Sequence, residues 1–152
     1  MKVEFSNNGY IDSLTGAPAP RNFFENLTRE IHKSQRHYQP LTILTFKYLP
    51  VSTKTESEKE LIELGRAINR NMRKGDFYSR IAQDGFWVCL HADQSEGRDS
   101  KIRFSKEIST LFSGKKSIVP GSKSNVDISL NFWDRDMSPT SWIAAIDVKY
   151  FQ

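Results

Sequence analysis

The stretch from residue 73 to residue 90 holds two features that could do chemistry. One is an Arg-x-x-Asp pair, Arg73 and Asp76, and the other is an Asp-Gly dipeptide between two apolar runs. An Arg side chain can donate two hydrogen bonds to the O6 and N7 edge of guanine, and an Asp can accept from its N1–H and amino group. The pair could therefore read a purine, or it could be a surface ion pair worth under about 1 kcal/mol.

Apolar periodicity predicts the elements that must position these residues. The predicted helices cover residues 21–37, 56–73, 100–112 and 138–150. The predicted strands cover residues 41–48, 77–82, 86–91 and 126–133, with a Gly/Ser/Lys loop at 113–125. The middle strands should join near Asp84 and Gly85, a dipeptide suited to the positive φ angles of a tight turn, and Gly75 should end the preceding helix.

The order of these elements from residue 41 onward is β-α-β-β-α-β. This order predicts an α+β fold with a ferredoxin-like core, in which a central sheet containing antiparallel pairs is flanked by helices. A length of 152 residues fits a single domain, residues 1–152, with a lead-in segment at 1–20.

Composition excludes several classes of protein. The net charge of +4 comes from scattered basic residues with no recognition motif, so we expect no nucleic-acid partner. No apolar run approaches the roughly 20 residues that cross a bilayer, and the N-terminus lacks a signal-peptide layout, which predicts no membrane segment and a cytoplasmic location. The single cysteine, Cys89, excludes an intrachain disulfide, and the histidines show no metal-ligand spacing, so no metal or cofactor is expected.

Several motifs resemble those of the GGDEF family, the diguanylate cyclase domains that make cyclic di-GMP from two GTP. Residues 12–21, DSLTGAPAPR, are similar to the D-x-LTG-x-PNR segment that opens the family, and Arg73 and Asp76 match its RxxD motif at the usual distance from the hairpin. The signature hairpin GGDEF would be preceded by Arg80 and would fall on Ala82, Gln83, Asp84, Gly85 and Phe86. Only Asp84 and Phe86 fit it.

The resemblance also predicts that catalysis is lost. A cyclase of this kind holds a divalent ion with carboxylates, and here Thr45 and Lys47 occupy the family's D-x-D positions at the first strand. Ala82 and Gln83 replace the glycines that let the hairpin backbone approach the nucleotide, and Gly85 replaces the second acid. We therefore expect no catalytic residues, no metal and no enzymatic activity.

The RxxD motif is the inhibitory site of these cyclases, where the product binds away from the hairpin. The resemblance therefore implies a cyclic di-GMP site at Arg73 and Asp76, with Gly75 leaving space for a stacked base. Arg103 lies in the stretch from which the family often supplies a further ligand-holding Arg, with Arg98 as the other option, and Arg80 completes the predicted set.

One further position bears on function. Glu58 could replace a guanine-reading Asp of the family, or it could be a solvated acid at the start of a helix. Three functions stay open: a cyclic di-GMP receptor, a ligand-free module for protein interaction or homodimerisation, and a residual diguanylate cyclase.

Overall fold

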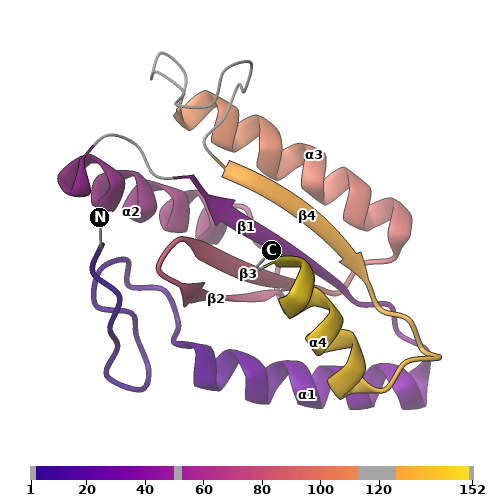
Figure 1. The fold of residues 1–152 in the computed structure, drawn as a ribbon. Coiled ribbons are helices and arrows are strands. Elements are labelled where there is room, and N and C mark those ends of the chain that lie inside the picture. The colour runs from indigo at the N-terminus through magenta and orange to yellow at the C-terminus, as the bar shows by residue number, and fades with distance from the viewer. Residues whose placement is uncertain (1–2, 50–52, 113–125, 151–152) are drawn as a thin grey trace.

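The computed structural model describes residues 3–49, 53–112 and 126–150 (Figure 1). The elements in this part of the chain are α1 Pro20–His37, β1 Thr42–Tyr48, α2 Lys54–Arg70, β2 Phe77–Ala82, β3 Gly85–Leu90, α3 Gln94–Leu111, β4 Val126–Phe132 and α4 Pro139–Tyr150. The loop predicted at 113–125 lies outside the described residues. The βαββαβ order, with one helix before it and one after it, is confirmed.

The strands form one antiparallel sheet in the order β2-β3-β1-β4. Every residue of β3 is buried, and in β1 only Lys47 is not, because each of these strands has a neighbour on both sides and helices on both faces. The edge strands β2 and β4 are largely half-buried. This arrangement is the predicted ferredoxin-like core.

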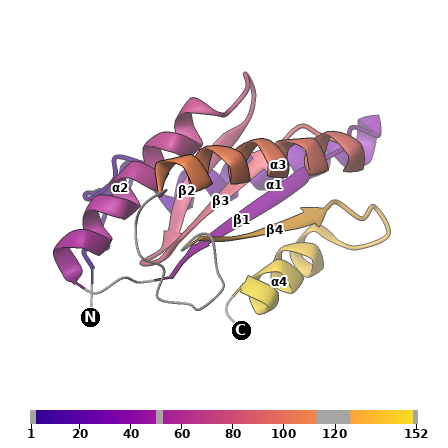
Figure 2. The same cartoon turned by 90° about the horizontal axis from the view of Figure 1, so that it is seen from above.

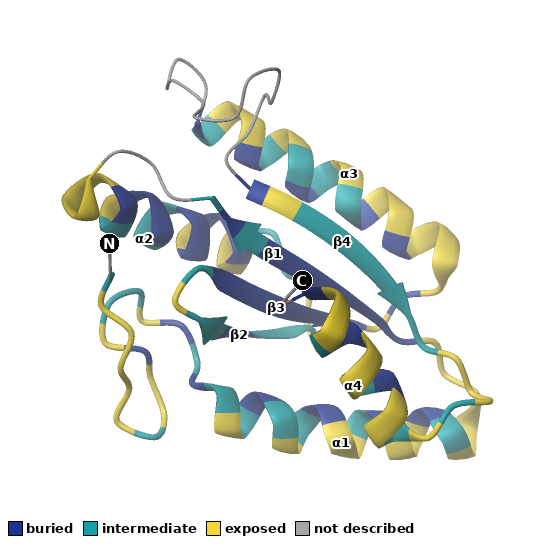
Figure 3. Ribbon diagram, in the orientation of Figure 1, coloured by how far each residue is buried: buried dark blue, intermediate teal, exposed yellow. Residues whose placement is uncertain are grey.

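The helices cover both faces of the sheet (Figures 2 and 3). Helices α2 and α3 pack on one face around a cluster that includes Leu44 and Phe46, while α1 and α4 pack on the other face around Ile43 and Trp87. In α1 an apolar residue recurs every fourth position, which places one stripe against the sheet: Phe23, Leu27 and Ile31.

Two helix boundaries differ from the prediction by three residues or more. Helix α3 begins at Gln94 rather than at residue 100, because Asp93 caps the N–H of Glu96 at 2.8 Å while the Glu96 side chain accepts from the N–H of Asp93 at 3.1 Å. This reciprocal pair is a capping box, which stabilises a helix start even where the next turn is polar. Helix α2 ends at Arg70 rather than at residue 73.

The hairpin turn is also placed differently from the prediction. Ala82 pairs with Gly85, so Gln83 and Asp84 form the connection and Gly85 belongs to β3. The glycines with positive φ in the described chain are Gly9, Gly16 and Gly75, and Gly85 is not among them. The prediction that the turn needs a positive φ at Gly85 is therefore wrong, and this glycine has another reason to be there.

Candidate functional site

The Arg-x-x-Asp pair lies in a tight turn between α2 and β2. The N–H of Asp76 donates to the carbonyl of Arg73 at 3.0 Å, and Gly75 has a φ of +93°, which suits the third position of a type II turn. The Asp76 carboxylate is 7% exposed and accepts from the N–H of Arg73 at 3.0 Å and from that of His91 at 3.3 Å. Asp76 thus fixes the turn, and Arg73 is exposed on it.

Arg103 of α3 reaches the segment between the end of α2 and this turn. Its guanidinium donates to the carbonyl of Asn71 at 2.9 Å. Burial and the positive charge of Arg73 lower the pKa of Arg103, and the negative charge of Asp76 partly opposes them. The fold therefore brings together three of the four residues predicted for the ligand site: Arg73, Asp76 and Arg103.

The other arginine of α3 does not join them. Arg98 donates to the side chain of Gln94 at 3.3 Å, and its guanidinium lies 5.5 Å from the ring centroid of Phe132. Of the two options in this helix, Arg103 is thus the one beside the turn.

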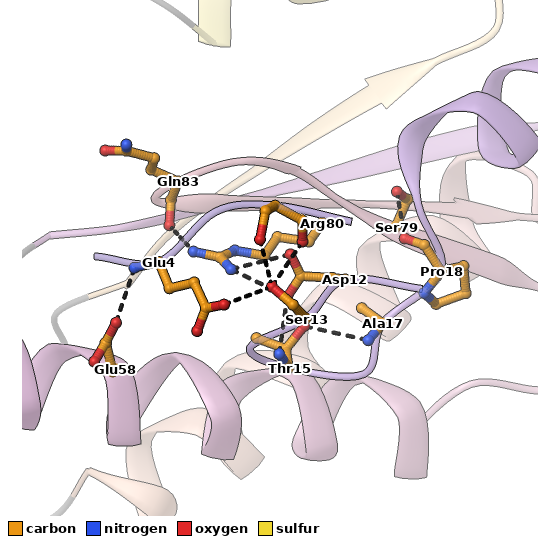
Figure 4. Close-up of polar contacts among 11 residues, drawn as sticks. Glu4, Asp12, Ser13, Thr15, Ala17, Pro18, Glu58, Ser79, Arg80 and Gln83 are labelled. Carbon is orange, nitrogen blue, oxygen red and sulfur yellow. Dashed lines mark hydrogen bonds and ion pairs between the residues drawn. The ribbon is translucent and has the colours of Figure 1, made fainter. Parts of the chain in front are cut away.

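Arg80, the fourth predicted residue, is buried elsewhere, contrary to the prediction. Its side chain is fully buried, and its Nη1 lies 3.1 and 3.0 Å from the two carboxylate oxygens of Asp12 in the lead-in segment (Figure 4). Its Nη2 donates to the carbonyl of Gln83 at 2.8 Å. Arg80 therefore ties the lead-in segment to the hairpin, because a buried guanidinium needs a paired carboxylate.

Gly85 makes room for α4. A Cβ atom built on Gly85 would coincide with the hydroxyl of Tyr150, whose ring packs edge-on against Trp87 with centroids 6.0 Å apart. The position that the resemblance matches to the family's second acid is thus covered by Tyr150 of α4. Any side chain at residue 85 would have to displace Tyr150.

The predicted positions of the lost metal ligands offer no acid either. Thr45 is buried in β1, and the Lys47 Nζ donates to the carbonyl of Tyr150 at 3.3 Å. Within residues 3–49, 53–112 and 126–150, no three His, Cys, Asp or Glu side chains cluster so as to hold a metal ion. With a lysine amine beside the hairpin and Asp84 as its one remaining signature acid, the residues present do not fit Mg²⁺.

A pocket of about 280 Å³ lies beside the hairpin. The described residues that line it are Val3, Tyr48, Ser57, Leu61, Ala82, Gln83 and Asp84. Asp84 is the only charged residue among them. A nucleoside triphosphate is held by cationic groups, and these described lining residues provide none. Glu58 is not part of this lining; its carboxylate accepts from the N–H of Glu4 at 2.8 Å (Figure 4).

Comparison with known proteins agrees with this α+β, nucleotide cyclase-like architecture. Residues 9–147 match the family described as "Diguanylate cyclase, GGDEF domain". The chain therefore belongs to the GGDEF family. No curated protein matches the sequence at a significant level.

Solved structures with the same fold include three from different bacteria. Diguanylate cyclase SiaD from Pseudomonas aeruginosa, in complex with its activator SiaC, is 18% identical over 93% of this chain and 56% of its own, with a TM-score of 0.74. The GGDEF domain of DgcB from Caulobacter crescentus, in complex with c-di-GMP, is 13% identical over 97% and 91%, with a TM-score of 0.75. A DGC protein from Thermotoga maritima is 19% identical over 88% and 95%, with a TM-score of 0.70. At these identities the likeness shows the fold.

Three residues with positional roles were missed from the sequence. Asp12 belongs to a recognisable motif, but its ion pair with Arg80 could not be predicted because the two residues are 68 positions apart in the chain. Tyr150 and His91 carry no local signal for their contacts with the hairpin and the turn.

No helix in the described part of the chain is long and apolar enough to span a membrane.

Proposed function

We propose that this domain is a catalytically inactive member of the GGDEF family that binds cyclic di-GMP at Arg73, Asp76 and Arg103. The observation that carries the proposal is the placement of two guanidinium groups and one carboxylate at a single turn. Burial first, and the positive charge of Arg73 second, lower the pKa of Arg103. A bound anion would offset the repulsion between the two guanidinium groups, and cyclic di-GMP carries two phosphates.

The three side chains retain the hydrogen-bonding capacity that guanine requires. Arg73 can present a fork of donors to the O6 and N7 edge, and Arg103 uses one of its five N–H donors on Asn71. Each oxygen of Asp76 accepts one backbone N–H, which leaves a second lone pair on each for the guanine N1–H and amino group. Arg80 is not part of the proposed site.

Loss of catalysis is proposed on separate grounds. The hairpin side presents a lysine amine where the resemblance places a metal-binding acid, and Tyr150 covers Gly85. Incubation of the purified protein with GTP and Mg²⁺ should therefore yield no cyclic di-GMP. Turnover that survives Asp84→Ala would come from a contaminant, whereas turnover abolished by Asp84→Ala would show that the domain is a cyclase.

Calorimetric titration with cyclic di-GMP tests the binding site. Arg73→Ala and Asp76→Asn should each weaken binding by about 5- to 150-fold, as expected for the loss of about 1–3 kcal/mol from a bidentate guanine contact. Arg103→Ala should also weaken binding, while the matched control Arg98→Ala, on the same helix, should not. Absence of heat at high micromolar ligand would contradict the proposal.

A second candidate function, a ligand-free module for protein interaction or homodimerisation, is favoured by apolar side chains on the lead-in segment. Tyr10 is 70% exposed and Ile11 is 52% exposed, side by side in this segment. The similar protein SiaD forms a complex with an activator protein. Sedimentation velocity can compare self-association of the wild type with that of the double variant Tyr10→Ser/Ile11→Ser. Self-association that the substitutions abolish, together with no cyclic di-GMP binding by either protein, would favour this function.

A further inference from the structure

His91 lies behind the turn that carries Arg73 and Asp76. Its Nε2 is 2.9 Å from an oxygen of Glu30 in α1, and its Nδ1 is 3.9 Å from Oδ1 of Asp76. Its backbone N–H donates to the same Asp76 oxygen at 3.3 Å. One imidazole ring thus stands between two carboxylates that come from elements far apart in the sequence.

The ring also occupies the space beside Gly75. A Cβ built on Gly75 would meet the Nδ1 of His91 at 3.6 Å. The prediction that Gly75 leaves room for a stacked base is therefore not supported on the side of the glycine where a Cβ would point, because the His91 imidazole occupies that space. The imidazole, itself 34% exposed, packs against the turn at Gly75, and Arg73 is exposed on the same turn.

We propose that His91 is a positioning residue for this site, linking α1 to the turn so that proton binding at the imidazole opposes cyclic di-GMP binding at Arg73 and Asp76. The proposal rests on the proposed function. His91 does not contact the ligand; it acts through Asp76.

The direction of the effect follows from the ring's two nitrogens. In the neutral ring, the hydrogen on Nε2 is donated to Glu30, and Nδ1 presents a lone pair toward Asp76. Protonation adds a hydrogen to Nδ1, and a small shift from 3.9 Å lets it bond to Asp76 Oδ1. That oxygen then has less capacity to accept from guanine, so binding weakens as pH falls.

The other charged groups around the ring do not provide the same switch. Lys33 pairs with Glu30 at 3.7 Å, and an amine is a type of side chain that does not exchange its proton in the pH range in which an imidazole does. Arg73 and Arg103 carry guanidinium groups, a type of side chain that stays protonated in proteins, and burial raises the pKa of Cys89. His91 is thus the imidazole that faces Asp76, and imidazole is the type of side chain that exchanges a proton between pH 5 and 8.

The first test uses the ligand-free protein. The amide proton of Arg73 donates to Asp76, so its NMR shift should change between about pH 8 and about pH 5.5, where histidine titrates. The change should vanish in His91→Gln, which keeps a donor for Glu30 but does not titrate, and persist in the control His32→Gln. An Arg73 amide shift that is flat, or that is unchanged in His91→Gln, would overturn the proposal whether or not the ligand binds.

The second test is calorimetry with cyclic di-GMP across the same pH range. Wild-type affinity should fall roughly fivefold, the value of one hydrogen bond, whereas His91→Gln should bind like wild type at about pH 8 and show no fall. His91→Ala should bind more weakly at every pH. Equal pH dependence in wild type and His91→Gln overturns the proposal and leaves the proposed function standing; no binding by wild type at any pH overturns both.

Discussion

Strand β2 has a turn at each end, and the two turns contrast. At six residues, β2 spans roughly 20 Å, so the turn at 73–76 and the hairpin at 82–86 are well separated. At the first turn Arg73 is exposed, and the Asp76 carboxylate and the Arg103 guanidinium lie near it. At the hairpin Arg80 is buried against Asp12 and Gly85 is buried under Tyr150.

The difference shows how one glycine can shape an exposed turn, where we propose the ligand site, and how another can let a helix cover a hairpin. Gly75 has a φ of +93°, and the turn it permits is the one that presents Arg73. Gly85 is an ordinary strand residue whose missing side chain lets α4 pack on the sheet.

The largest effect is expected from the ion pair beneath the hairpin. Asp12→Ala leaves the fully buried guanidinium of Arg80 without its carboxylate, which should lower the free energy of unfolding by about 3–5 kcal/mol. Urea denaturation measures this loss, with Asp134→Ala on an exposed loop as the control. A loss under about 1 kcal/mol would mean that Arg80 is free for another role, and the contrast between the two turns would fail.

Adding a side chain at residue 85 should have the next largest effect. Gly85→Ala places a methyl group where the Tyr150 hydroxyl lies, and overpacking of this kind costs about 1–3 kcal/mol. In the Tyr150→Ala background the same substitution should cost less, since the space is then open. Additive losses in the double variant would show that Tyr150 does not cover the hairpin.

A cap substitution should affect stability without affecting binding. Asp93→Ala removes the N-cap of α3 and should cost about 1 kcal/mol by frayed first-turn hydrogen bonds. Arg103 lies well inside the same helix, so cyclic di-GMP affinity at a temperature where the variant is folded should match wild type. A parallel loss of affinity would show that the ligand site depends on the whole helix.

Each region contributes a smaller effect at alkaline pH. Burial, with Glu30 and Asp76 nearby, raises the pKa of Cys89 above its ordinary 9.0, and burial beside Asp84 raises that of Tyr150 above its ordinary 10.0. The unfolded chain releases these protons first, so stability is full below about pH 9 and falls as pH rises further. Denaturation at several pH values should show a shallower fall in Tyr150→Phe and in Cys89→Ala, and an unchanged slope in both would contradict these shifts.

The sequence predicted the elements because apolar periodicity records which face of each element is buried. Predicting the apolar stripe of α1 and the order of helices and strands along the chain required no knowledge of tertiary contacts. The start of α3 at Gln94 could also be predicted from the sequence, because Asp93 and Glu96 have the spacing of a capping box.

Tertiary partners could not be predicted in the same way. Arg80 sits three residues before a turn, and nothing in that position distinguishes a ligand contact from a buried pair with Asp12. Likewise, an Asp-Gly dipeptide indicates a turn. In the structure, however, residue 85 lacks a side chain because Tyr150, 65 positions later in the chain, occupies the space that a Cβ would need. Spacing grouped Arg73 with Asp76, but only the fold could show that His91 lies behind them.

The most direct test of the contrast is the map of amide chemical-shift changes when cyclic di-GMP is added to the isotope-labelled protein. The account predicts changes at residues 73–76 and around Arg103, with residues 82–86 unaffected, and no changes anywhere with GTP and Mg²⁺ at the same concentration. Changes centred on residues 82–86 with either ligand, and none at 73–76, would contradict it.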